Sequence, residues 1–219
     1  MHPARRDSPP RPRAPLAVAC AVLLLLVAVR WSPLMDLDGG IVRALHRGAV
    51  AEPGLTRVNR VLSDWVWDPW AMRALVAVVA ALVAWRLRDR VLAAWLLVTC
   101  ALGSLVQQGL KAVVDRPRPV WPDPVDSAHF AAFPSGHAMT ATVVCGLVLW
   151  LLRRRGAGPV LWGAALAVSV VSVLGVGVTR LWLGVHWPSD VLGGWLLGAL
   201  TVTLSTTAYE KWRGPNSRP

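Results

Sequence analysis

The sequence predicts an all-α integral membrane protein, a bundle of six transmembrane helices with short amphipathic helices between the first and second spans. The 219 residues are 55% hydrophobic and only 16% charged, with a mean hydropathy of +0.49. Soluble domains usually carry roughly 25% charged residues. Apolar runs near the ~20 residues needed to cross a bilayer recur along the chain. Basic residues gather at the ends of these runs, where loop charge sets membrane orientation.

The chain begins with residues 1–15, which are rich in proline and arginine and are predicted to form a disordered cytoplasmic tail. The apolar run from Leu16 to Val29 can extend to about Met35 and predicts the first span. A signal peptide also places charged residues before an apolar run. No small-x-small cleavage site follows this run, so a retained transmembrane helix is favoured.

Residues 36–70 form the longest polar stretch of the chain. Apolar residues recur in it at helical spacing, with a break at Pro53 and Gly54, which predicts short amphipathic helices on the membrane surface. Five further apolar spans follow, and with the first they assign residues 16–208 to one membrane domain, before a cytoplasmic tail at 209–219. These five spans are 71–85, 91–114, 136–152, 159–179 and 188–208.

The short loops at 86–90 and 153–158 each carry three arginines. Because short loops follow the positive-inside rule most reliably, both loops are predicted to be cytoplasmic. The protein is then a multi-pass plasma-membrane protein with both termini in the cytoplasm.

Three polar clusters interrupt the apolar sequence between residues 111 and 190, and this topology places all of them on the extracytoplasmic side. The clusters are Lys111 with Arg118, then Ser135-Gly136-His137, then Arg180 with His186 and Asp190. Three cations, two imidazoles and a carboxylate are sufficient to bind a phosphate dianion and attack its phosphorus without a metal.

The first cluster stands out because Lys111 is one of only two lysines in an arginine-rich chain. A cation at hydrocarbon depth is costly and is usually functional or interfacial. Pro117 and Pro119 end the helix and stiffen the loop that carries Arg118. Arg116, in contrast, is predicted to be an ordinary snorkelling residue at a helix end.

The second and third clusters both have the features of helix starts. Ser135 is a good N-cap, and Gly136 lets the backbone amides of the next helix approach an anion. His137 is either a functional acid or a surface histidine. Asp190 falls in the first turn after Pro188, so it can cap that helix, orient His186 through Nδ1, or do both.

The ordered set Lys-x6-Arg-Pro, Pro-Ser-Gly-His and Arg-x5-His-x3-Asp resembles the type 2 phosphatidic acid phosphatase (PAP2) superfamily of membrane lipid phosphatases. The resemblance covers about residues 70–208, with one departure: Thr179 stands where the family usually has serine. It implies that His186 is the nucleophile, oriented by Asp190, and that His137 protonates the leaving group. It also implies phosphate binding by Lys111, Arg118, Ser135, Gly136 and Arg180.

The expected function is therefore metal-independent hydrolysis of a lipid phosphate or diphosphate through a phosphohistidine. The candidate substrates are undecaprenyl diphosphate, phosphatidylglycerol phosphate and phosphatidic acid. We expect no metal, no cofactor and no nucleic-acid partner; the partners are the lipid bilayer and the lipid phosphate. Two alternatives remain, a lipid phosphotransferase and a non-catalytic protein that binds or transports lipid phosphates. In the loop before the second cluster, Asp126 and His129 could line the entrance to the site, but a solvated loop is favoured.

Overall fold

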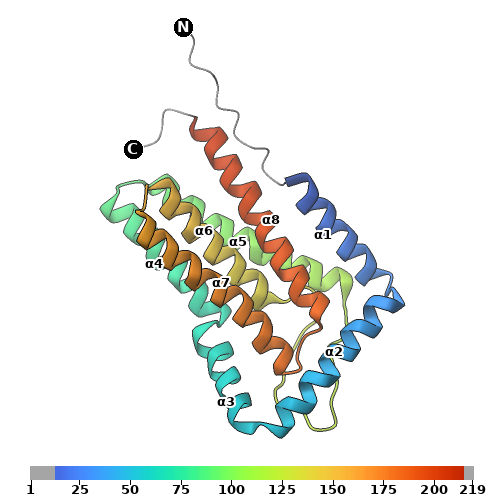
Figure 1. Cartoon of the computed structure of the whole chain (residues 1–219). Coiled ribbons are helices and arrows are strands. Elements are labelled where there is room, and N and C mark those ends of the chain that lie inside the picture. The colour runs from blue at the N-terminus through green and yellow to red at the C-terminus, as the bar shows by residue number, and fades with distance from the viewer. Residues whose placement is uncertain (1–12, 215–219) are drawn as a thin grey trace.

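The computed structural model describes residues 13–214, and every regular element in that range is helical. In chain order the elements are α1 (Arg13–Ala28), α2 (Ser32–Ala51), α3 (Pro53–Val61), the π-helical turn η1 (Leu62–Val66), α4 (Pro69–Arg86), α5 (Arg90–Val114), α6 (Gly136–Arg154), α7 (Pro159–Trp182) and α8 (Pro188–Arg213). The predicted all-α membrane bundle is confirmed (Figure 1). Most of the N-terminal tail, residues 1–12, and residues 215–219 lie outside the described range, whereas residues 13–15 and 209–213 are helical.

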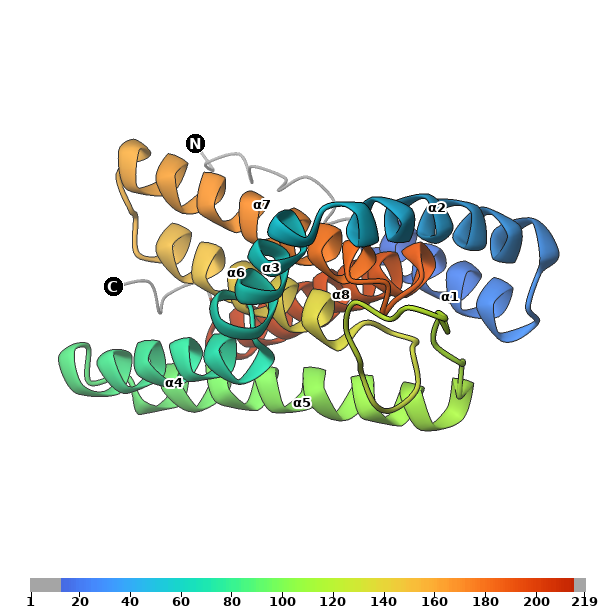
Figure 2. The same cartoon turned by 90° about the horizontal axis from the view of Figure 1, so that it is seen from below.

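Helix α6 is at the centre of the bundle, where it packs against α8, α7, α4 and α5 (Figures 1 and 2). The main apolar core draws residues from all five of these helices. Outside the core, α5 and α7 expose large apolar side chains such as Leu105, Val168 and Val171. An apolar outer surface is what helices immersed in lipid present.

Five helical segments are long and apolar enough to cross a membrane, and a sixth span requires α1 and α2 to be counted as one broken span. The prediction that the first span extends toward Met35 is wrong, because α1 ends at Ala28 and the chain turns by 86° into α2. Arg30 adopts a positive φ of 51° in this turn, and Pro33 occupies the first turn of α2. Proline fits a helix start but removes the amide hydrogen that a continuous helix would use.

The polar segment between the first two spans contains the predicted helices, α2 and α3. Helix α2 packs against α7 and α8, and η1 packs against α7. The buried face of α2 includes polar side chains, Asp38 and His46, as well as Val42. This segment therefore belongs to the bundle, and one of its polar residues contributes to the site described below.

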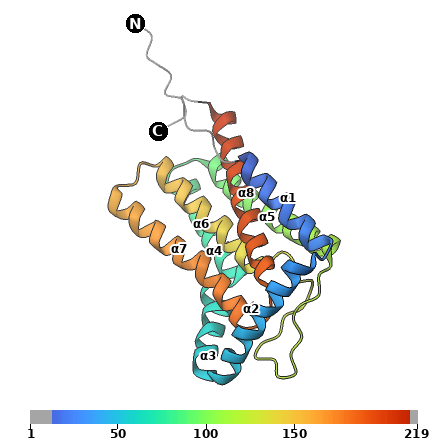
Figure 3. The same ribbon diagram turned by 45° about the vertical axis from the view of Figure 1, so that its right-hand side comes forward.

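The two ends of the bundle differ in what they carry (Figures 1 and 3). The start of α1, the end of α8 and the α4–α5 and α6–α7 turns share one end. Helix α2, the long loop after α5 and the α7–α8 turn share the other end. The three polar clusters identified in the sequence therefore lie at the same end of the bundle.

Candidate active site

His186 lies in the turn between α7 and α8 and contacts the first turn of α8. Its Nδ1 is 3.3 Å from Oδ2 of Asp190, and the backbone amide of Trp187 donates to the same oxygen at 2.8 Å. His186 is 2% exposed and Asp190 is fully buried. Asp190 thus caps α8 and contacts the imidazole at the same time.

Arg118 covers the other side of the His186 ring. Its Nη1 is 3.1 Å from His186 Nε2 and also donates to the carbonyl of Val185 at 2.6 Å. The remaining guanidinium nitrogens donate to the carbonyls of Phe130 and His129. Burial and the nearby charge of Arg180 lower the pKa of Arg118 to about 10, so it remains cationic at neutral pH.

These contacts determine the state of His186. A proton on Nδ1 can be donated to Asp190, which leaves the Nε2 lone pair facing Arg118. Burial, reinforced by the charges of Arg118, Arg180 and Lys111, lowers the pKa of His186 well below its usual value. The ring is therefore a neutral imidazole at physiological pH, and its unprotonated Nε2 accepts from the Arg118 guanidinium.

Lys111 and Arg180 complete a cationic face around this nitrogen. Lys111, in the last turn of α5, donates from Nζ to the carbonyl of Ala131, and Arg180, near the end of α7, donates from Nη1 to Ser63 Oγ at 2.6 Å. Lys111 interacts electrostatically with both Arg118 and Arg180. Three cations from α5, the following loop and α7 thus converge on one volume, which a phosphate dianion would neutralise.

The Pro-Ser-Gly-His segment forms the start of α6, as the sequence predicts. The hydroxyl of Ser135 accepts from the amide of Ala138, and the Ser135 amide donates to the Asp190 carbonyl at 2.9 Å. A Cβ on Gly136 would lie 2.8 Å from Nε2 of Gln107, so only glycine fits here without displacing that side chain. A helix start leaves backbone amides without intrahelical acceptors, and such amides can bind an anion.

His137 is half-buried on the first turn of α6 and interacts electrostatically with His186, Arg180 and Arg118. Both imidazoles therefore flank the same volume. Gln107, which lies between α5 and α6 and is 5% exposed, is a site residue that the motifs do not reveal. The sequence signal that could have indicated it is its position, one helical turn before Lys111 in a largely apolar span.

The interpretation of Arg116 as a snorkelling residue is wrong. Arg116 is 7% exposed, and its Nη1 donates to Asp190 Oδ1 at 2.7 Å and to Ser189 Oγ at 2.6 Å. Its Nη2 donates to Asp38 Oδ2 at 2.7 Å. Loop residues 115–118 turn this side chain inward because Asp115 leaves the helix in a left-handed conformation, with φ 40°.

Asp38 joins the site from α2, 151 residues before Ser189. Its Oδ1 accepts from the Ser189 amide at 2.9 Å, and its Oδ2 accepts from the Ser189 hydroxyl as well as from Arg116. The chain of contacts Asp38–Arg116–Asp190–His186 is buried throughout. It fixes the Asp190 carboxylate relative to the imidazole.

The prediction that Asp126 is solvated is also wrong. Its Oδ2 lies 4.0 Å from Arg180 Nη1, and its side chain is 17% exposed. His129 takes part through its carbonyl, which accepts from Arg118. The loop between the first two clusters, which joins α5 to α6 (Figure 2), therefore contacts Arg118 and Arg180 of the cationic face. Among residues 13–214, no group of three or more His, Cys, Asp or Glu side chains is arranged to hold a metal ion.

Comparison with known proteins identifies the family. The family model of the PAP2 superfamily matches residues 92–213. The chain is 28% identical to phosphatidylglycerophosphatase B of Bacillus subtilis over 90% of its own length and 95% of the relative. It is 32% identical to a decaprenylphosphoryl-5-phosphoribose phosphatase of Mycobacterium tuberculosis, over 73% of this chain and 83% of that one.

A solved structure has the same architecture. The crystal structure of a transmembrane PAP2-type phosphatidylglycerolphosphate phosphatase from Bacillus subtilis superimposes with a TM-score of 0.74 at 25% identity. The alignment covers 89% of this chain and 96% of that one. The resemblance drawn from the three motifs is thereby confirmed: the chain belongs to the PAP2 superfamily and is a multi-pass membrane hydrolase that acts on phosphate esters of lipids.

Proposed function

We propose that the protein hydrolyses a lipid phosphate or diphosphate at the extracytoplasmic face of the plasma membrane, by transferring the phosphoryl group to His186. The observation that carries this proposal is the position of His186 Nε2. This nitrogen belongs to a neutral ring held by Asp190 on one side, and it faces Arg118 on the other. A nucleophile adjacent to cations suits attack on a phosphorus atom bearing anionic oxygens.

The proposed reaction proceeds in two steps. The Nε2 lone pair of His186 attacks phosphorus while the bond from phosphorus to the leaving oxygen breaks, and His137 donates a proton to that oxygen. Asp190 stabilises the positive charge that forms on the ring. In the second step water attacks the phosphohistidine and gives a proton to the now neutral His137; the phosphorus–nitrogen bond breaks, which releases inorganic phosphate and restores the neutral His186 ring and the protonated His137.

In this proposal Lys111, Arg118 and Arg180 bind the oxygens of the transferring group, with hydrogen bonds added by Ser135 and Gly136. Preorganised donors around such oxygens supply a large part of the catalysis of phosphoryl transfer. The three cations provide the positive charge that Mg²⁺ supplies elsewhere. The activity is therefore expected to be unchanged by EDTA.

The side of the membrane follows from loop charge. The arginine-rich loops at 86–90 and 153–158 are at the end of the bundle opposite the site. Under the positive-inside rule this end is cytoplasmic, so the site faces outward. The candidate substrates are phosphatidylglycerol phosphate, phosphatidic acid and undecaprenyl diphosphate; the first is the lipid named by the Bacillus relative.

The test is phosphate release from purified lipid phosphates in nanodiscs, with the wild type and His186→Ala compared at saturating substrate. We expect release by the wild type, with and without EDTA, and none by the variant. His129→Ala is a matched control, because His129 contributes only its carbonyl to the site. Full activity of His186→Ala would reject the assignment of His186 as the nucleophile. Formation of a new phospholipid without release of inorganic phosphate would indicate a transferase. Binding of lipid phosphate without turnover would indicate a non-catalytic protein.

A further inference from the structure

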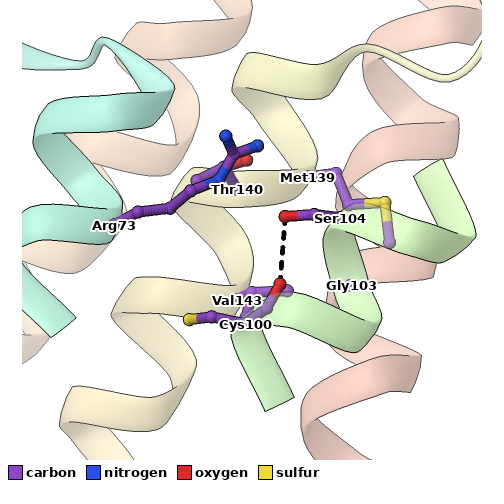
Figure 4. Close-up of a pocket in the computed structure, with 7 residues that line it drawn as sticks. All are labelled: Arg73, Cys100, Gly103, Ser104, Met139, Thr140 and Val143. Carbon is purple, nitrogen blue, oxygen red and sulfur yellow. Dashed lines mark hydrogen bonds between the residues drawn. The ribbon is translucent and has the colours of Figure 1, made fainter. Parts of the chain in front are cut away.

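A small, mostly apolar cavity lies between α4, α5 and α6, on the hydrocarbon side of the cationic face, and Arg73 is the charged residue in its lining. Arg73 of α4, Ser104 of α5 and Thr140 of α6 are among the residues that line it (Figure 4). Thr140 follows Gly136 by four residues, or about 6 Å along α6, and Ser104 precedes Lys111 by seven residues, or about 10 Å along α5. The cavity is therefore about two turns or less below the phosphate-binding residues.

Arg73 brings a cation to this cavity that the protein itself does not neutralise. Within residues 13–214 it makes no ion pair, and its Nε is shielded from solvent without a hydrogen-bond acceptor. Its guanidinium lies 5.2 Å from the centre of the Trp70 ring. That contact compensates the charge only in part, and ionisable residues of transmembrane helices usually face the bundle interior, have a charged or polar partner and mark a functional path.

The position of Arg73 limits which anion could be that partner. A lipid substrate presents its terminal phosphoryl group to the site, and its remaining part extends from there toward the hydrocarbon. Arg73 interacts electrostatically with His137, the residue assigned to the leaving oxygen. An anion at the mouth of the cavity would therefore belong to the part of the lipid that is retained after cleavage.

We propose that Arg73 binds a second phosphoryl group, one that stays on the lipid, and that it makes the enzyme selective for lipids with two phosphoryl groups. This inference rests on the proposed function. In a diphosphate, the second group is bonded to the leaving oxygen itself. In a phosphodiester such as phosphatidylglycerol phosphate it is separated from that oxygen by a short alcohol.

A diphosphate would gain from Arg73 during the reaction as well as on binding. When His186 attacks the terminal phosphorus, the broken bond leaves its electron pair on an oxygen of the retained phosphate. A cation beside that phosphate stabilises the charge until His137 has delivered its proton. A lipid monophosphate leaves as an uncharged alcohol and has no group for Arg73 to bind.

The experiment compares wild type and Arg73→Gln on two lipid pairs in nanodiscs. The first pair is a polyprenyl diphosphate and the monophosphate of the same chain length, and the second is phosphatidylglycerol phosphate and phosphatidic acid. We expect kcat/KM for at least one two-phosphoryl lipid to fall roughly 10- to 100-fold, the range for a lost charged hydrogen bond. The matching one-phosphoryl lipid should change by about twofold or less. The lipid pair whose two-phosphoryl member loses activity shows whether Arg73 binds the retained phosphate of a diphosphate or that of a phosphodiester.

Two further variants serve as controls. Arg86→Gln removes an arginine from the opposite end of α4, where it lies 4.4 Å from the centre of the Trp85 ring, and should change neither pair. Arg73→Lys keeps the charge and should retain part of the preference, even if Arg73→Gln folds poorly. An equal loss on both members of each pair, or none on any, would overturn the proposal. Absence of turnover by the wild type would instead reject the proposed function.

Discussion

The cations of the site form two groups that differ in how they are bound. The lower layer is Arg116 with Asp38 and Asp190, and the upper layer is Lys111, Arg118 and Arg180. In the lower layer Arg116 is bonded to two carboxylates, those of Asp38 and Asp190. In the upper layer Lys111 and Arg118 are held mainly by backbone carbonyls. Carbonyls satisfy the donors of a cation without neutralising it. The lower layer therefore orients Asp190, and the upper layer keeps its charge available for an anion.

Arg116→Gln gives the largest effect expected from this comparison, and the effect should be on stability. Removing one partner of a buried ion pair typically costs about 3–5 kcal/mol, since the carboxylates left behind remain buried. For a chain of this size the melting temperature in detergent should fall by roughly 6–20 °C. Turnover should fall too, because Asp190 loses its support.

The control for this variant is Arg47→Gln, which removes an exposed arginine of α2 and should leave the melting temperature unchanged. Asp38→Asn removes the outer carboxylate of the same network. If the network acts as one unit, the double variant with Arg116→Gln should lose less stability than the sum of the two single losses. Additive losses would show that the two residues act independently.

Arg118→Gln should produce the reverse pattern, with a large loss of activity at nearly normal stability. Loss of one preorganised donor to a transition-state oxygen usually costs roughly 100- to 1,000-fold in rate. Phe130 and His129 are exposed, so solvent can replace Arg118 at their carbonyls, and the glutamine amide can donate to the buried Val185 carbonyl; folding should therefore be little affected. A drop in melting temperature as large as that of Arg116→Gln would remove the distinction between the two layers.

Much of the upper layer could be predicted from sequence, as could Asp190 of the lower layer, whereas Asp38 and the role of Arg116 could not. Lys111, Arg118, Ser135 and Arg180 occur in short motifs at helix ends, and an alternating topology brings those ends together. Asp38 has no such motif, because its partners lie 78 and 151 residues away. The sequence signal for Asp38 is its spacing from the neighbouring buried positions of α2.

That spacing places Asp38, Val42 and His46 four residues apart on the buried face of α2. A carboxylate at a position that faces the core indicates that a buried partner is present. Here the partner is the cation Arg116. The bend after Ala28 was missed for a similar reason: the apolar run continues past it, and only Arg30 and Pro33 disturb the pattern.

A pH measurement sharpens the role of the upper layer. Since burial and nearby cations lower the pKa of His186, the ring is neutral and active down to a pH below its usual titration range. In Arg118→Gln one of these cations is gone, so protonation becomes easier and the acidic limb of kcat/KM should move to higher pH. The ionisation of the lipid phosphate is the same for both enzymes and cancels in the comparison. A limb that stays in place would mean that Arg118 does not act on His186.

The smallest expected effect concerns Asp126, a carboxylate that lies 4.0 Å from Arg180 of the upper layer. At this distance it weakens a charge that phosphate would otherwise use fully. Asp126→Asn should therefore tighten binding of inorganic phosphate or vanadate, by roughly two- to fivefold, in the range of a partly exposed ion pair. Inhibition constants measured at two salt concentrations provide the check, since the gain should shrink as salt screens the pair. Weaker binding in Asp126→Asn would mean that this carboxylate holds Arg180 in place. Asp126 would then have the same orienting role as the carboxylates of the lower layer.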